Sequence, residues 1–140
     1  MMGGGKALLA LATAMWAGAL AAVGFMVAPK LFALLPDRKL EGEVAGHMFV
    51  DMAWLSLIGC IILLVYFLFA HPDVWRWLLL FIVALCTALN HFWVRSIIVA
   101  LKTGGTMDKS FAFWHGISSL LYTLTLIGVV GLSFMLIRHE

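Results

Sequence analysis

Four long apolar runs follow one another along the chain, and they limit its fold more than any other feature. We expect helices over residues 7–28, with a short continuation to 35, and over 38–70, 74–102 and 108–137. Each run meets or exceeds the roughly 20 residues that an α-helix needs to cross the bilayer core. No segment shows the strict alternation of a half-buried strand. The sequence therefore predicts an all-α protein with four transmembrane helices.

The composition argues against a soluble protein. Hydrophobic residues make up 64% of the 140 residues and charged residues 11%, against about 45–50% and 25% in soluble domains. The formal net charge is only +2, without a long basic run, so nothing indicates nucleic-acid binding. We expect one integral membrane domain over residues 1–140, with the lipid bilayer as its main partner.

Short polar breaks separate the four runs. They fall at Pro36–Lys39, His71–Asp73 and Thr103–Gly105, where proline and glycine end helices. Connections this short place consecutive helices antiparallel, which predicts an up-down-up-down four-helix bundle. The first run resembles a signal peptide, but its apolar stretch continues to Ala28, longer than a usual signal sequence. We therefore expect a retained helix.

Basic residues near the helix ends predict the orientation of the bundle. Because cytoplasmic loops carry an excess of lysine and arginine, we expect the first and third connections to face the cytoplasm and both termini to lie outside it. The side of the first and third connections carries Lys30, Arg38, Lys39, Lys102 and Lys109, and the opposite side carries Lys6, Arg76 and Arg138.

A band of polar side chains lies inside the apolar runs. Arg95 is the most demanding, because a charged residue deep in the bilayer costs roughly 2.5–3.5 kcal/mol unless it is paired. Counting 1.5 Å per residue from the side of the first and third connections puts the band about 5–16 Å deep on three helices. Its members are His47 and Asp51 in the second run, His91 and Arg95 in the third with Asn90 beside them, and His115 and Ser118 in the fourth.

Two interpretations of Arg95 stay open. In the first, it forms a structural ion pair with Asp51, or with Glu43 nearer the surface. In the second, its forked donors hold an oxygen of a small ligand, namely a lipid headgroup, a quinone or a metal complex. His115, Ser118 and Asn90 would then add hydrogen bonds, and Asp51 would offset the positive charge.

Histidines raise the alternative of a metal or b-type haem site. His47, His91 and His115 are the candidate ligands, since imidazole binds both copper and haem iron. Met48 and Met52 flank His47 and Asp51 and would suit copper, but methionine is as typical of core filling.

A structural role is a further interpretation. Ala14, Gly18 and Ala22 form a small-xxx-small face in the first run, which predicts close packing with another helix or a homo-oligomer interface. Transport by an oligomer is an alternative, although no inverted repeat is evident. The chain has no G-x-S-x-G, H-E-x-x-H, P-loop or C-x-x-C-H motif, so nothing in it indicates an enzyme.

Three motifs along the chain share an order and spacing. They are Ala28-Pro29-Lys30-Leu31-Phe32 with Leu35-Pro36, Gly42, Gly46 and Phe49; Asn90, Trp93 and Val94; and Phe111 with His115-Gly116-Ile117-Ser118. Together they resemble the transmembrane-protein-205-like proteins over about Trp16 to Leu126. The chain departs from that family's pattern at Ser96, where proline is common, and at Tyr122, where asparagine is common. The resemblance implies a small multi-span protein with no agreed activity, whose bacterial members form a domain of unknown function; a bacterial inner membrane is the location it implies.

Overall fold

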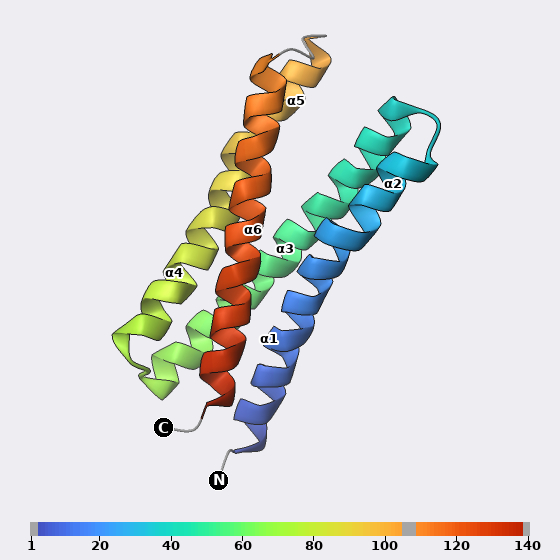
Figure 1. Ribbon diagram of the computed structural model, residues 1–140. Helices are drawn as coiled ribbons and strands as arrows, with labels where there is room; N and C mark the ends of the chain where they lie inside the picture. The colour runs from blue at the N-terminus through green and yellow to red at the C-terminus, as the bar shows by residue number, and fades with distance from the viewer. Residues whose placement is uncertain (1–2, 105–108, 139–140) are drawn as a thin grey trace.

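The computed structural model describes residues 3–104 and 109–138, and their regular structure is helical throughout, without strands (Figure 1). Four helices are long and apolar enough to cross a membrane: Gly4–Leu34, Arg38–Ala70, Val74–Thr103 and Ser110–Ile137. The predicted fold class, an all-α antiparallel bundle of four membrane helices, is confirmed. The expected start of the last helix at residue 108, and Gly105 at the preceding break, lie outside the described residues.

Two of the four spans contain a widened π-helical turn, in which backbone bonds reach five residues back instead of four. Pro29 follows the first of these turns, and the helix continues past it to Leu34. The first span comprises α1 (Gly4–Ala22), η1 (Val23–Val27) and α2 (Ala28–Leu34); the second is α3 (Arg38–Ala70); the third comprises α4 (Val74–Ala88), η2 (Leu89–Val94) and α5 (Arg95–Thr103); the fourth is α6 (Lys109–Ile137).

Local chemistry fixes both ends of α3. At its start, the Asp37 carboxylate accepts a hydrogen bond from the backbone N–H of Lys39 at 2.9 Å, which satisfies one of the free donors of a helix N-terminus. At its end, His71 adopts a left-handed conformation with φ 48°, and Pro72 cannot continue the helix. The chain therefore reverses within three residues and enters α4.

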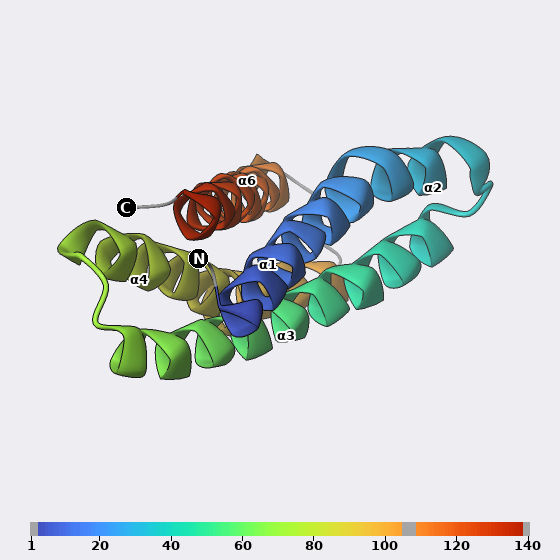
Figure 2. The same cartoon turned by 90° about the horizontal axis from the view of Figure 1, so that it is seen from below.

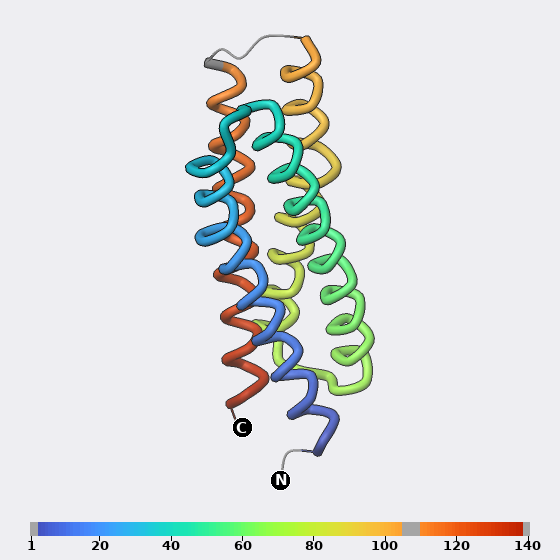
Figure 3. Tube along the Cα trace, turned by 90° about the vertical axis from the view of Figure 1, so that its right-hand side faces the viewer, coloured from blue at the N-terminus to red at the C-terminus, as the bar shows by residue number. Residues whose placement is uncertain are grey.

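The four spans alternate in direction, so the termini and the α3–α4 turn share one end of the bundle (Figures 1 and 3). α6 packs against α1 on one side and α4 on the other, and α3 packs against α4 and α1. Seen from below, in Figure 2, α2 and the first turns of α3 diverge from the other two helices. The bundle thus has two unlike halves.

We call these the terminal half (residues 4–22, 56–88 and 120–138) and the splayed half (residues 23–55, 89–104 and 109–119). The largest fully buried side chains, such as Phe67 and Leu20, all belong to the terminal half. There α4 and α6 meet so closely that a Cβ at Gly128 would lie 2.4 Å from Val83 Cγ2. In the splayed half the buried side chains are Ala28, Glu41, Ala45 and Val94.

Candidate functional site

The expected ion pair of Arg95 does not form. Arg95 begins α5 and is exposed, and Asp51 on α3 is exposed as well. Within residues 3–104 and 109–138, Arg95 lies within salt-bridge distance of neither Asp51 nor Glu43, while Asp73 and Arg76 are paired at 3.3 Å. At 1.5 Å per residue, Arg95 sits about 12 Å inside the end of its helix at Thr103. Its long side chain can reach from there toward the membrane surface.

Two of the predicted site residues, Asn90 and Ser118, meet across the bundle. The Ser118 hydroxyl donates to Asn90 Oδ1 at 2.7 Å, and Asn90 Nδ2 donates to the backbone carbonyl of Ser118 at 3.2 Å. This reciprocal pair ties η2 to α6. The polar groups of Asn90 are therefore engaged within the protein, which suits a positioning role better than ligand contact.

The histidines lie in different surroundings. His47 is exposed on α3, and His115 is exposed on α6, where its ring stacks on Phe111 with centroids 5.9 Å apart. His91 is half-buried in η2, edge-on to Trp54 of α3 at 5.4 Å. Among the residues that the structure describes, no three His, Cys, Asp or Glu side chains lie close enough to hold a metal ion. The three imidazoles therefore form no part of a three-residue ligand group of this kind in the described residues.

His91 and Thr87 are unusual because each buries a polar atom without a hydrogen-bond partner in the described part of the chain. The atoms are His91 Nδ1 and Thr87 Oγ1, and Thr87 is only 5% exposed. Leaving such a group unsatisfied costs roughly 1–3 kcal/mol. The two residues are four apart at the junction of α4 and η2.

Other hydroxyl residues in these helices behave differently from Thr87. Thr13, Ser119, Thr123 and Thr125 each donate to the backbone carbonyl four residues earlier, at 2.8–3.0 Å. That bond is the ordinary way for a threonine or serine to satisfy itself inside a helix. The Thr87 hydroxyl has not taken it, so this hydroxyl remains able to bond to something else.

Tyr122 forms a polar contact that the sequence did not indicate. Its hydroxyl donates to the Leu20 carbonyl and also interacts with the Gly24 backbone N–H. In an uninterrupted α-helix these two backbone groups would bond to each other. The hydroxyl is therefore inserted into the backbone ladder of the first span at η1, a known cause of local distortion. A Cβ at Gly24 would lie 2.6 Å from Tyr122 Cε1, so glycine is required there.

The small-residue stripe on the first span faces outward. Ala14 and Gly18 are exposed, and nothing lies within 4 Å of a Cβ built at Gly18. Within this chain the stripe does not serve helix packing; α1 instead contacts α3 through Trp16, whose Nε1 donates to Ser56 Oγ at 3.0 Å.

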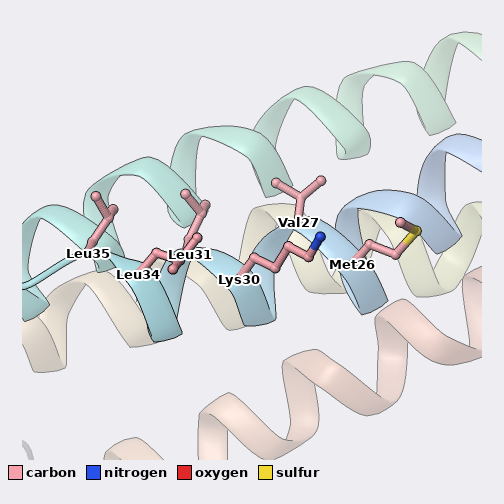
Figure 4. A pocket seen from close by; sticks show the side chains of 6 residues that line it. All are labelled: Met26, Val27, Lys30, Leu31, Leu34 and Leu35. Atoms are coloured by element: carbon pink, nitrogen blue, oxygen red, sulfur yellow. The ribbon is translucent and has the colours of Figure 1, made fainter.

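One apolar cavity of about 340 Å³ follows the outer part of the first span. Its lining comes from η1, α2 and Leu35, the residue that follows α2, as Figure 4 shows. Lys30 is the one charged side chain among the six that line it, so the cavity suits an acyl chain better than a polar ligand. The lining residues are Met26, Val27, Lys30, Leu31, Leu34 and Leu35.

Comparison with known proteins gives a family. The model of the family described as Domain of unknown function (DUF4149) matches residues 11–107, more than half of the chain. The matched region contains both π-helical turns and the Thr87–His91 pair. No curated protein and no solved structure is significantly similar to the chain.

Proposed function

The chain belongs to the DUF4149 family, and on that premise we propose that this integral membrane protein binds a small ligand inside the bilayer rather than catalysing a reaction. The observation that carries the proposal is the unsatisfied pair Thr87 Oγ1 and His91 Nδ1. Buried polar groups in proteins are nearly always hydrogen-bonded, and an exception calls for an absent partner. A bound ligand would supply that partner.

The depth of the pair selects among the candidate ligands. Thr87 and His91 lie near the middle of the 30-residue span Val74–Thr103, each at least about 18 Å from the nearer end at 1.5 Å per residue. Lipid headgroups stay outside the hydrocarbon core, which is about 30 Å thick. A membrane-soluble molecule that carries carbonyl oxygens on an apolar body, such as a quinone, fits this depth better. The described residues include no group of three side chains that could hold a metal ion, which also favours a quinone over a metal.

The surrounding residues can be given roles on this proposal. The Thr87 hydroxyl donates to a carbonyl oxygen of the ligand, and His91 makes a second hydrogen bond through Nδ1. Trp54 and Phe92, whose rings lie 5.4 and 4.8 Å from the His91 ring, form an aromatic wall. Arg95, one turn further on, offers its guanidinium to a more distant oxygen.

The remaining predicted residues act at longer range. Asn90 and Ser118 hold η2 against α6 and so fix the orientation of His91. Asp51 and His115 are exposed on the neighbouring helices α3 and α6, where they would border the entrance from the lipid. There the Asp51 carboxylate would offset the charge of Arg95, and His115 would offer a hydrogen bond. Their contribution to affinity is therefore expected to be smaller than that of Thr87 or His91.

Binding of a short-chain ubiquinone to the purified protein in nanodiscs tests the proposal. Trp54 adjoins the site, so its fluorescence should be quenched, and the quenching should be lost in Trp54→Phe. Thr87→Val and His91→Phe should each weaken binding at least about tenfold, the equivalent of 1.4 kcal/mol. Thr123→Val and His47→Phe serve as matched controls and should bind normally.

A stability measurement separates lost binding from lost folding. Thr87→Val replaces an unpaired hydroxyl with a methyl group of similar shape, so the ligand-free protein should be as stable as the wild type or up to about 1 kcal/mol more stable. Normal quinone affinity in Thr87→Val and His91→Phe would refute the proposal. Haem or copper ligation stays a less favoured alternative, which a visible spectrum and elemental analysis of the same sample address.

A second copy of the chain is the partner we propose for the outward stripe Ala14, Gly18 and Ala22. Gly18 meets open space in the monomer, and small-xxx-small faces join helices in membranes by close backbone approach. Gly18→Leu should abolish cross-linked dimers in membranes, whereas Gly116→Leu, also in open space, should not. An oligomeric transporter would need the same assembly, because four helices enclose little space.

The membrane and the orientation complete the proposal. A bacterial inner membrane and kinship with the transmembrane-protein-205-like proteins are supported by the motif around Asn90 and by that from Phe111 to Ser118. The bias of basic residues favours termini outside the cytoplasm. A reporter fused to the C-terminus that is active only in the cytoplasm should therefore stay inactive.

A further inference from the structure

A second cavity lies at the end of the bundle that carries the termini. It has a volume of about 170 Å³, and all four spans contribute to its wall. Lys6 of α1, Arg76 of α4 and the turn residue His71 bring basic groups to it, while Tyr66 of α3 and Leu136 of α6 form part of its apolar floor. It is a polar cavity in a protein whose surface is mostly apolar, and it is remote from the Thr87–His91 pair.

Arg76 is held rigidly in this cavity. Its guanidinium donates to the carbonyl of Met135 near the end of α6 at 3.0 Å and pairs with Asp73 at 3.3 Å. The side chain is only 13% exposed. A fixed guanidinium pays little further entropy when an anion arrives, which favours binding.

The charges around the cavity add up to a positive site. Among the described residues of the wall, Lys6 and Arg76 are cationic, Asp73 is the one acidic side chain, and His71 can add a hydrogen-bond donor. His71 is held beside the cavity by its left-handed backbone, with φ 48°. Such a conformation is uncommon outside glycine, and it places the imidazole at the turn between α3 and α4.

We infer that this cavity binds a phosphate-bearing anion. Arginine and lysine side chains bind phosphate oxygens through charge-assisted hydrogen bonds. This cavity lies at the ends of four spans, the level at which headgroup phosphates are found, and the apolar side chains of Phe67 and Leu136 also line it. The same chemistry would also accept a soluble phosphate ester.

Nanodiscs distinguish the two sources. The full chain is placed in phosphatidylcholine discs with and without phosphatidylglycerol, and retained phosphatidylglycerol is measured by native mass spectrometry. Glycerol 3-phosphate is titrated separately in phosphatidylcholine discs. Lys6→Gln should weaken binding of the effective probe about fivefold, corresponding to roughly 1 kcal/mol for one basic residue near the membrane surface. Lys39→Gln, at the opposite end of the bundle, is the matched control and should bind normally.

Asp73→Asn provides a change of opposite sign. Asp73 precedes α4 without a side-chain capping bond, so its replacement costs the helix little, and it removes the competing negative charge. Anion binding should therefore become tighter. Selective retention of phosphatidylglycerol identifies a lipid site, and binding of glycerol 3-phosphate identifies a soluble ligand. Equal binding by the wild type, Lys6→Gln and Asp73→Asn, or no binding of either probe, would overturn the inference.

Discussion

The terminal and splayed halves of the bundle differ in how their helices meet. In the terminal half, glycines let backbones approach: a Cβ at Gly59 would lie 2.7 Å from the Trp16 ring, and one at Gly128 would lie 2.4 Å from Val83. In the splayed half, Gly46 and Gly116 have nothing within 4 Å of a Cβ, and the close contact of Gly24 with Tyr122 lies at the border with the terminal half. Lipid tails are as apolar as the side chains, so helices in a membrane associate through packing shape and not through hydrophobicity. The two halves therefore differ in how closely the surfaces of their helices fit together.

The boundary between the halves is held by α6. Tyr122 inserts its hydroxyl into the first span at η1, and Ser118, one turn earlier, bonds to Asn90 in η2. Both π-helical turns thus sit where α6 makes a polar contact with a neighbouring span. We therefore expect packing in the terminal half to supply most of the stability. The unsatisfied Thr87–His91 pair lies beside the less tightly packed splayed half.

The largest effect on the free energy of unfolding is expected from a cavity in the terminal half. Phe67 is 0% exposed and Phe92, in the splayed half, is 58% exposed. Phe67→Ala should lower the free energy of unfolding by about 3 kcal/mol, the low end for large-to-small core changes, because part of the transfer term is absent in lipid. Phe92→Ala should cost less than about 1 kcal/mol. Denaturant unfolding in mixed micelles measures both, and equal losses would remove the distinction between the halves.

A smaller effect is expected at the boundary. Tyr122→Phe deletes the hydroxyl that joins Leu20 and Gly24. The Leu20 carbonyl keeps the Val23 N–H as a donor, so the Gly24 N–H must either stay unpaired or re-form an ordinary α-helical bond. The expected loss is about 1 kcal/mol, since an unsatisfied donor costs roughly 1–3 kcal/mol and partial repair reduces this. Tyr66→Phe, whose hydroxyl has no hydrogen bond among the described residues, is the control and should change stability by less than half as much. The same unfolding assay applies, and an unaffected Tyr122→Phe would show that the insertion does not stabilise the boundary.

The sequence was sufficient for the four spans, because apolar length sets them. Residue counting put Asn90 and Ser118 at a similar depth, but it did not predict that they bond to each other. It was insufficient for Arg95 because depth does not give direction around the helix. His91 and Arg95, four residues apart, would share a face of a regular α-helix. The π-helical turn Leu89–Val94 includes His91 and ends just before Arg95, so α-helical periodicity does not predict how the two side chains point relative to each other.

The role of Tyr122 was missed for a related reason. A tyrosine within an apolar run predicts an interfacial or packing residue, and Gly24 on a distant helix gives no sign that a hydroxyl enters the backbone there. Only the distorted turn η1 reveals the match between the two. The sequence also could not show that Thr87 and His91 bury unsatisfied polar atoms, because the lack of a partner is a property of the packed structure.

The smallest effect on stability is expected from the loss of one polar contact in the splayed half. Ser118→Ala removes the hydroxyl that donates to Asn90 Oδ1 at 2.7 Å, and interhelical hydrogen bonds in membranes contribute only about 0.6 kcal/mol on average. A double-mutant cycle with Asn90→Ala should give a coupling energy of that order. Ser119→Ala, which breaks only a bond to the His115 carbonyl of its own helix, should show no coupling with Asn90→Ala. If the Ser118 cycle also gives no coupling, α6 does not hold η2, and the orientation of His91 must be set by its contact with Trp54 alone.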